Sequence, residues 1–311
     1  MMSTKNEAAA ENNIMCASCG IAQDEVDVTL MKCACHLVKY CSISCQKQHR
    51  PQHKKACKKR LTEMRDEILF KQPKNSNIGD CPICCLPLSG DPGKSTMMGC
   101  CSKLICLGCD FANKKREIRQ SLQLRCAFCR EPIPDTEGFD EINLKRSEKN
   151  DPFALTQLGM DCLNKGAYHD AFEYITKAAE LGNADAHYNL SVMYHEGKGV
   201  EKNSNKKIHH LEEAAIAGHL DARYNLGIYE CRNAKFERAA KHFIIASNLG
   251  HHESLKRVIS KDDYGAALRA YQARINEMKS SEREEAEAYY NFGPAGQAAL
   301  RESTLREALW C

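Results

Sequence analysis

The chain has 311 residues, of which 43% are hydrophobic and 27% charged, and its formal net charge is +3. That length fits two or three domains with enough apolar residues for a core. No stretch approaches the ~18 apolar residues of a membrane span, and residues 1–13 are polar, without the apolar core of a signal peptide. We therefore expect neither a membrane-spanning nor a secreted protein, and we expect residues 1–13 to be a disordered tail.

Cysteine is concentrated in the first half of the chain: sixteen of the nineteen cysteines lie between Cys16 and Cys129. Most come in pairs whose spacing lets one short turn supply two corners of a zinc tetrahedron. His53 is interleaved at ligand spacing, whereas many disulfides would suit an oxidising compartment. The pattern predicts Zn²⁺ as the cofactor and a reducing, cytoplasmic or nuclear location.

The first cysteine module spans residues 14–60. Its order is Cys16-x2-Cys19, Cys33-x-Cys35, Cys41-x3-Cys45 and His53-x3-Cys57. Residues 16–57 resemble a MYND zinc finger. The resemblance implies two interleaved zinc sites, one formed by Cys16, Cys19, Cys41 and Cys45 and the other by Cys33, Cys35, His53 and Cys57.

Two positions depart from the MYND pattern. One residue, instead of two, separates Cys33 from Cys35, so His36 is an alternative to Cys35 as a ligand. Arg50 stands at about the place of the family's tryptophan, near the groove with which MYND fingers bind short peptides. The apolar spacing over 61–69 predicts a helix that leaves this module, followed by a linker through residue 79.

The second cysteine module spans residues 80–134. Its pairs are Cys81-x2-Cys84, Cys100-Cys101, Cys106-x2-Cys109 and Cys126-x2-Cys129. It resembles a RING finger, which implies one zinc site formed by Cys81, Cys84, Cys106 and Cys109 and a second that includes Cys101, Cys126 and Cys129. Lys103 stands where the fourth ligand of the second site is usual. The fourth ligand is then Cys100, Cys85 or none.

RING fingers commonly act as ubiquitin ligases by positioning a ubiquitin-conjugating enzyme, without a nucleophile of their own. Ile83 matches the family's apolar contact with that enzyme, and Arg130 matches the cation that holds ubiquitin. Both have a plainer interpretation, since Ile83 also suits a small core and Arg130 a solvated surface. Ala127 stands where the family usually has a proline.

After a polar linker at 135–150, residues 151–290 are repetitive and helical. The hexapeptide beginning at Asp185 recurs at Asp221, a shift of 36 positions, and Gly182, Gly218 and Gly250 each follow a pair of small residues. Such helix–turn–helix units stack into a solenoid. Over 151–252 they resemble Sel-one-like repeats, which usually scaffold complexes. We expect a further helix at about 261–290 and a tail at 291–311.

The predicted fold is a pair of small zinc-bound modules, MYND and RING-like, followed by an all-α helical-repeat solenoid. All of these parts are of kinds that bind proteins or peptides, so the sequence favours a non-catalytic interaction adaptor. The alternative is a RING-type ubiquitin ligase whose repeats present the substrate, and the sequence does not decide whether the chain is an enzyme. The lysine- and arginine-rich run at 47–60 is the only support for nucleic acid, and a solvated helix face explains it better, so we do not expect nucleic acid as a partner.

Overall fold

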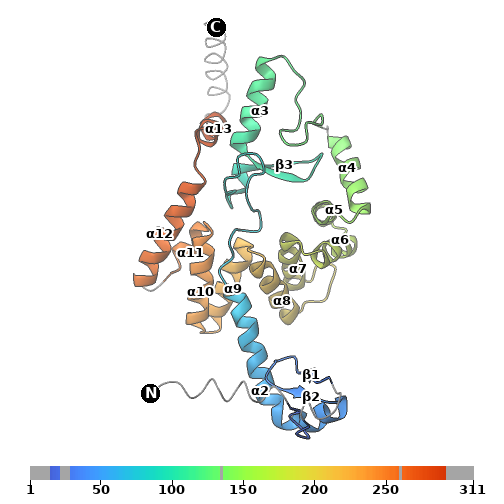
Figure 1. Cartoon of the computed structure of the whole chain (residues 1–311). Coiled ribbons are helices and arrows are strands. Elements are labelled where there is room, and N and C mark those ends of the chain that lie inside the picture. Colours follow the sequence, from blue (N-terminus) through green and yellow to red (C-terminus); the bar gives the residue numbers. More distant parts are fainter. Residues whose placement is uncertain (1–14, 22–28, 134–135, 259–260, 292–311) are drawn as a thin grey trace. The chain divides into compact units, whose positions relative to one another are not determined.

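The computed structural model describes residues 15–21, 29–133, 136–258 and 261–291. It divides into two compact units, Met1–Lys71 and Gln72–Cys311. Figure 1 colours the first unit blue, and the second continues from there to red. The expected tail at 1–13 lies outside the described residues, as does all but the first residue of the expected tail at 291–311.

The first unit is a short antiparallel hairpin followed by one long helix. Its elements are β1 (Met31–Lys32), β2 (Lys39–Tyr40) and α2 (Ile43–Leu69). Ser42 caps α2 by accepting a hydrogen bond from the Cys45 amide at 3.2 Å. The helix expected at 61–69 is present as the last part of α2, which begins inside the cysteine module.

The buried side chains of this unit's small core are mainly cysteines. The core consists of Cys16, Leu30, Cys33, Cys35 and Tyr40. So few apolar side chains cannot offset the entropy of ordering the chain around them. The cysteines therefore have to contribute through something other than apolar packing, and metal binding is the usual means.

The second unit begins with a cysteine module built on a hairpin and a helix. Its elements are η1 (Pro92–Lys94), β3 (Ser95–Met98), β4 (Lys103–Cys106) and α3 (Leu107–Arg119). β3 and β4 pair antiparallel, with Ser95 opposite Cys106. Cys106 ends the strand and caps α3, because its sulfur accepts from the Cys109 amide at 3.4 Å. The strand-to-helix transition thus positions one cysteine pair.

The segment 135–150, expected to be a linker, contains the helix α4 (Thr136–Glu148). Arg146 donates hydrogen bonds to the carbonyls of Cys100 and Cys101, each at 3.4 Å. A Cβ added to Gly99 would lie 2.0 Å from Cδ2 of Phe139, so α4 packs directly on the turn between β3 and β4. These tertiary contacts stabilise a helix that has little amphipathic pattern of its own.

The stacked helices follow in antiparallel pairs (Figure 1). The pairs are α5 (Pro152–Asn164) with α6 (Tyr168–Glu180), α7 (Ala184–Glu196) with α8 (Ser204–Ile216), and α9 (Leu220–Arg232) with α10 (Phe236–Asn248). The chain continues through α11 (His252–Leu255), α12 (Lys261–Glu277) and α13 (Ser281–Asn291). The expected fold class, zinc-module cysteine clusters followed by stacked helical pairs, is confirmed.

Each expected pair of small residues is buried where its helix meets the next. Ala178, Ala214 and Ala246 are fully buried. Gly182, Gly218 and Gly250 follow them with φ of 83°, 89° and 96°, a left-handed conformation that only glycine adopts at little cost. The expected position and chemistry of the repeat turns are thus confirmed.

The segment before the second cysteine module lies on the helical repeats. The Asn77 amide donates to the Gly218 carbonyl at 3.2 Å, and its side chain donates to Asp185 Oδ1 at 2.7 Å. A Cβ on Gly218 would lie 2.8 Å from the Asn75 carbonyl oxygen. The expected linker is therefore held against the starts of α7 and α9. Within the described ranges, no helix is long and apolar enough to cross a membrane.

A substitution at Gly218 tests this attachment against a matched control. Gly182 occupies the same place in the preceding repeat, and a Cβ there would meet nothing within 4 Å. We expect Gly182→Ala to cost about 1 kcal/mol of unfolding free energy, from the left-handed backbone alone. Gly218→Ala should cost about 1–3 kcal/mol more, because its methyl group displaces the linker.

Chemical denaturation and amide exchange across residues 74–79 measure the two effects. Faster exchange of the linker in Gly218→Ala only is the expected result. Equal stability and equal linker exchange in both variants would contradict the attachment.

Candidate metal centres

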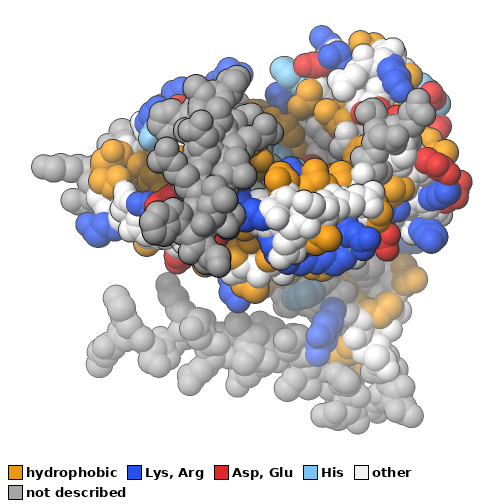
Figure 2. Space-filling view, turned by 90° about the horizontal axis from the view of Figure 1, so that it is seen from above, with side chains coloured by type: hydrophobic (Ala, Val, Ile, Leu, Met, Phe, Trp, Pro, Cys, Tyr) orange, Lys and Arg blue, Asp and Glu red, His pale blue; other side chains and the backbone are white. Residues whose placement is uncertain are grey.

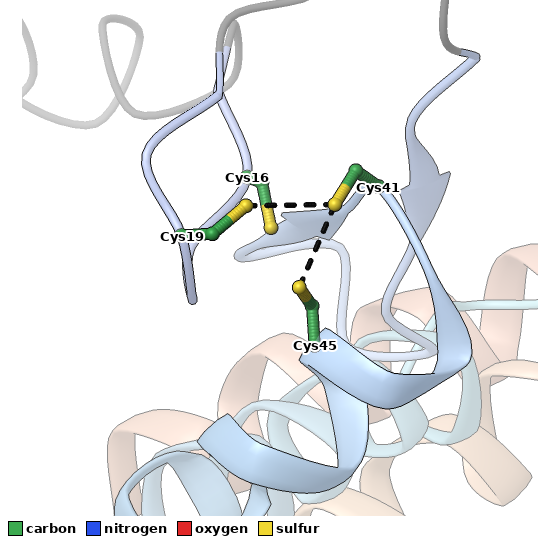
Figure 3. A group of neighbouring side chains, drawn as sticks. All are labelled: Cys16, Cys19, Cys41 and Cys45. Atoms are coloured by element: carbon green, nitrogen blue, oxygen red, sulfur yellow. Dashed lines mark hydrogen bonds between the residues drawn. The ribbon is translucent and has the colours of Figure 1, made fainter.

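The first cluster joins the N-terminal turn to the start of α2. It consists of Cys16, Cys19, Cys41 and Cys45. Figure 3 shows the four sulfurs converging, and the Cys41 sulfur lies 3.5 Å from those of Cys19 and Cys45. The Ala17 amide donates to the Lys39 carbonyl at 3.0 Å, which ties the first cysteine turn to β2. These are the ligands that the MYND resemblance implied for one site.

The second cluster lies between the hairpin and the middle of α2. It consists of Cys33, Cys35, His53 and Cys57. His53 Nε2 lies 3.1 Å from the Cys35 sulfur and 3.5 Å from the Cys33 sulfur, and His53 and Cys57 share one face of the helix, four residues apart. Burial lowers the pKa of His53, with His49 acting in the same direction, which favours the neutral imidazole that binds metals.

The geometry distinguishes Cys35 from His36 as the candidate metal ligand. Cys35 is fully buried in the cluster, whereas His36 is exposed. His36 has φ of 59° because it occupies the tight turn in which its amide donates to the Cys33 carbonyl at 2.9 Å. We propose Cys35 as the ligand.

The third cluster combines the first turn of the second module with the start of α3. It consists of Cys81, Cys84, Cys106 and Cys109. The sulfurs of Cys84 and Cys106 lie 3.8 Å apart, and the Cys81 sulfur accepts from the Cys106 amide at 3.5 Å. Cys81 and Cys106 are buried, so any cation held here would be shielded from water.

The fourth cluster brings two adjacent cysteines of the second module together with its last cysteine pair. It consists of Cys100, Cys101, Cys126 and Cys129. The sulfurs of Cys100 and Cys129 lie 3.3 Å apart and those of Cys101 and Cys126 3.8 Å apart, so two adjacent cysteines both face the cluster. Lys103, in the usual ligand's place, is exposed.

Cys85 lies outside both clusters of the second module. It is exposed with φ of 58°, and it follows the turn in which its own amide donates to the Cys81 carbonyl. Arg130 has the same role after the other turn, with φ of 65° and its amide donating to the Cys126 carbonyl. Cys85 and Arg130 thus each lie at the end of a cysteine turn. The backbone of the turn, and not a metal, sets the direction of each side chain.

Hydrogen bonds and burial shift the pKa values of thiols in the first and third clusters. Hydrogen bonds with Cys19 and Cys45 raise the pKa of Cys41 to about 12, and burial raises the pKa of Cys109 to about 12. A hydrogen bond from Cys106 lowers the pKa of Cys81 to about 4, despite burial. In the third cluster the Cys81 thiolate is thus favoured over that of Cys109, and a bound cation would favour ionisation of all four thiols. Each described cysteine is free of disulfide bonds.

The two residues expected to contact a conjugating enzyme line one groove. Ile83, Ala127 and Arg130 meet there with the exposed side of α3, and Ser280 and Glu282 form one edge. We call this the α3 groove. Ile83 is 41% exposed, so it is not core filler. The face of the molecule seen in Figure 2 likewise shows hydrophobic side chains exposed beside lysines and arginines.

Arg130 is not free in solvent. Its Nη1 donates to Asn113 Oδ1 at 2.6 Å and lies 3.8 Å from Glu117, whose carboxylate is buried. The guanidinium is therefore held against α3, although half of the side chain is exposed. A role in contacting a partner would use this fixed orientation.

Comparison with known proteins identifies two parts of the chain. Residues 16–57 match the MYND finger, and residues 152–183, 184–219 and 220–251 each match the Sel1 repeat. The chain thus carries a MYND finger and three Sel1 repeats, both of which are protein-binding modules. The RING likeness of the second cysteine module stays a prediction.

Matches to whole proteins are limited. No curated protein matches the chain. Among solved structures, a Sel1 repeat protein from Oxalobacter formigenes is 27% identical, with a TM-score of 0.35, over 37% of this chain and 93% of that one.

Zinc content distinguishes the two cysteines that compete in the second module. We expect the wild type and Cys85→Ser to hold about four zinc ions per chain, and Cys100→Ser about three, because serine replaces a thiolate ligand. Elemental analysis after dialysis against a mild chelator measures the difference. Zinc loss in Cys85→Ser with full occupancy in Cys100→Ser would contradict the proposed ligand set.

Proposed function

We propose that the protein is a zinc-stabilised scaffold that brings proteins or short peptides together. The observation that carries this proposal is the presence of a MYND finger and three Sel1 repeats in one chain, since both kinds of module bind proteins. The MYND unit offers exposed apolar side chains for such a contact, among them Met31, Leu37 and Ile43.

The chemistry of the clusters supports a structural role for the metal. Each cluster offers four side-chain ligands, three or four of them sulfur, to a Zn²⁺ ion. Four protein ligands complete a tetrahedron, whereas a catalytic zinc keeps one position for water or substrate. Thiolates held in this way also require a reducing compartment, which is consistent with a cytoplasmic or nuclear location.

A second candidate function is that of a ubiquitin ligase. The observation that favours it is the α3 groove, where Ile83 and Arg130 lie together as a conjugating-enzyme surface would require. Substrate would then bind the repeats. We rank it second because Ala127 replaces the usual proline and because Arg130 already pairs with α3.

A reconstituted ubiquitin-discharge assay separates the two functions. The chain is mixed with a panel of ubiquitin-loaded conjugating enzymes, and loss of the thioester is followed. The scaffold proposal predicts that the chain does not accelerate loss of the thioester, because a scaffold does not need the α3 groove to bind conjugating enzymes. Acceleration by at least tenfold that is lost in both Ile83→Ala and Arg130→Ala would establish the ligase instead.

The scaffold proposal also requires that the MYND finger and the repeats bind separate partners. Partners cross-linked to the chain in cells should divide into a set lost in Cys45→Ser, which removes a ligand of the MYND finger, and a set that is retained. Loss of every partner, or of none, would contradict separate binding by the finger and the repeats. Zinc analysis of Cys45→Ser confirms that only the first unit has been altered.

A further inference from the structure

The last described helix, α13, packs along α3 of the second cysteine module. The Phe111 ring lies 4.9 Å, centroid to centroid, from that of Tyr289, and Ala286 is fully buried. Lys94 pairs with Glu287 at 3.2 Å, and Lys115 pairs with Glu285. These contacts bring the end of the helical region onto the cysteine module, as Figure 1 shows.

The two helices approach each other closely at the start of α13. A Cβ added to Gly108 would lie 2.7 Å from the Arg283 amide nitrogen. Any larger residue at Gly108 would push the two helices apart. Since Gly108 lies between Cys106 and Cys109, the approach occurs at the third cluster itself.

The Arg283 side chain ends on the other cysteine turn of the same cluster. Its Nη1 donates to the Pro87 carbonyl at 2.7 Å and its Nη2 to the Leu86 carbonyl at 3.3 Å. Nη2 also lies 3.5 Å from the Cys84 sulfur, across 199 positions of the sequence. A second bond from Nη1 to the Met278 carbonyl, at 2.9 Å, fixes the guanidinium.

This donor complements those that the module supplies to its own sulfurs. The Cys81 sulfur accepts a hydrogen bond from the Cys106 amide, and the Cys106 sulfur accepts one from the Cys109 amide. The Cys84 sulfur receives its donor from α13. Four thiolates with one Zn²⁺ carry a formal charge of about −2, and a guanidinium beside them offsets part of it. A hydrogen bond to a metal-bound thiolate also fixes its orientation.

We propose that Arg283 is a positioning residue of the third metal centre, which hydrogen-bonds the zinc-bound Cys84 thiolate and thereby links zinc retention to the docking of α13. The inference rests on the zinc occupancy proposed above. Binding of zinc favours the docked helix, and by linkage the docked helix slows the release of zinc. Ser280 and Glu282 then hold one edge of the α3 groove in place.

The test compares zinc release from the full chain in four forms. They are the wild type, Arg283→Ala, Arg283→Lys and, as a matched control, Arg269→Ala, which changes an exposed arginine of the neighbouring helix α12. A chromogenic chelator measures the rate of release, and cysteine alkylation read by mass spectrometry assigns it to a cluster. We expect about 10–100-fold faster release from the Cys84 cluster in Arg283→Ala, partial rescue in Arg283→Lys and no change in Arg269→Ala.

A further variant separates positioning from simple packing. Tyr289→Ala removes the aromatic contact with Phe111 near the other end of α13 and keeps the guanidinium. With Co²⁺ in place of zinc, removal of the donor should shift the thiolate-to-metal absorption band in Arg283→Ala and leave it unmoved in Tyr289→Ala. An unmoved band in both, or equal acceleration of release from every cluster in Arg283→Ala, would overturn the proposal.

Failure of this inference can be told from failure of the proposed zinc sites. A wild-type chain without metal at the Cys84 cluster would refute the occupancy itself. A wild-type chain that holds zinc there, with no difference between Arg283→Ala and Arg269→Ala, would refute the role of Arg283 alone.

Discussion

The mutual repulsion of clustered thiolates is the constraint on which both cysteine modules depend. In each cluster the four ligand atoms lie within 4.8 Å of one another. Two thiolates at such a distance repel by roughly 4 kcal/mol at the effective dielectric constant of a protein surface. A divalent cation turns that repulsion into attraction, and the small apolar cores around the clusters supply too little energy to replace it.

The second cysteine module is built into the helical region that follows it. Arg146 of α4 donates to the backbone beside the fourth cluster, and Arg283 of α13 donates to the backbone and a sulfur of the third. The preceding linker is bonded to the repeats through Asn77. The module is thus held by the linker and α4, which flank it in the sequence, and by α13, which is distant in the sequence.

Local signals in the sequence were sufficient for much of this structure. Cysteine spacing predicted the ligand pairs, because each pair lies within one turn, and the MYND and RING resemblances implied which pairs come together. Glycines predicted the repeat boundaries, because each must adopt a left-handed backbone. Spacing does not show which of two adjacent cysteines is the metal ligand. Cys100 lies in the hairpin turn between β3 and β4, and this turn directs its sulfur into the fourth cluster. The turn depends on the pairing of β3 with β4, and Cys85 lies outside it.

Tertiary contacts account for what the sequence did not reveal. The helix α4 is polar, and it is stabilised by Phe139 against Gly99 and by Arg146 against the fourth cluster. Arg283 lies 199 positions from the cysteine it contacts, and no spacing rule reaches so far. Such residues can be recognised only when the fold brings them to the site.

The most direct test of the account is amide exchange of the wild-type chain before and after removal of zinc with a strong chelator. If the second cysteine module and its flanking helices form one zinc-dependent body, exchange should rise together in residues 80–133, 136–148 and 281–291. The helices α6 and α7 should keep their protection, because they pack on each other around Ile175 and Leu190. Undiminished protection of 281–291 in the metal-free chain would contradict the account.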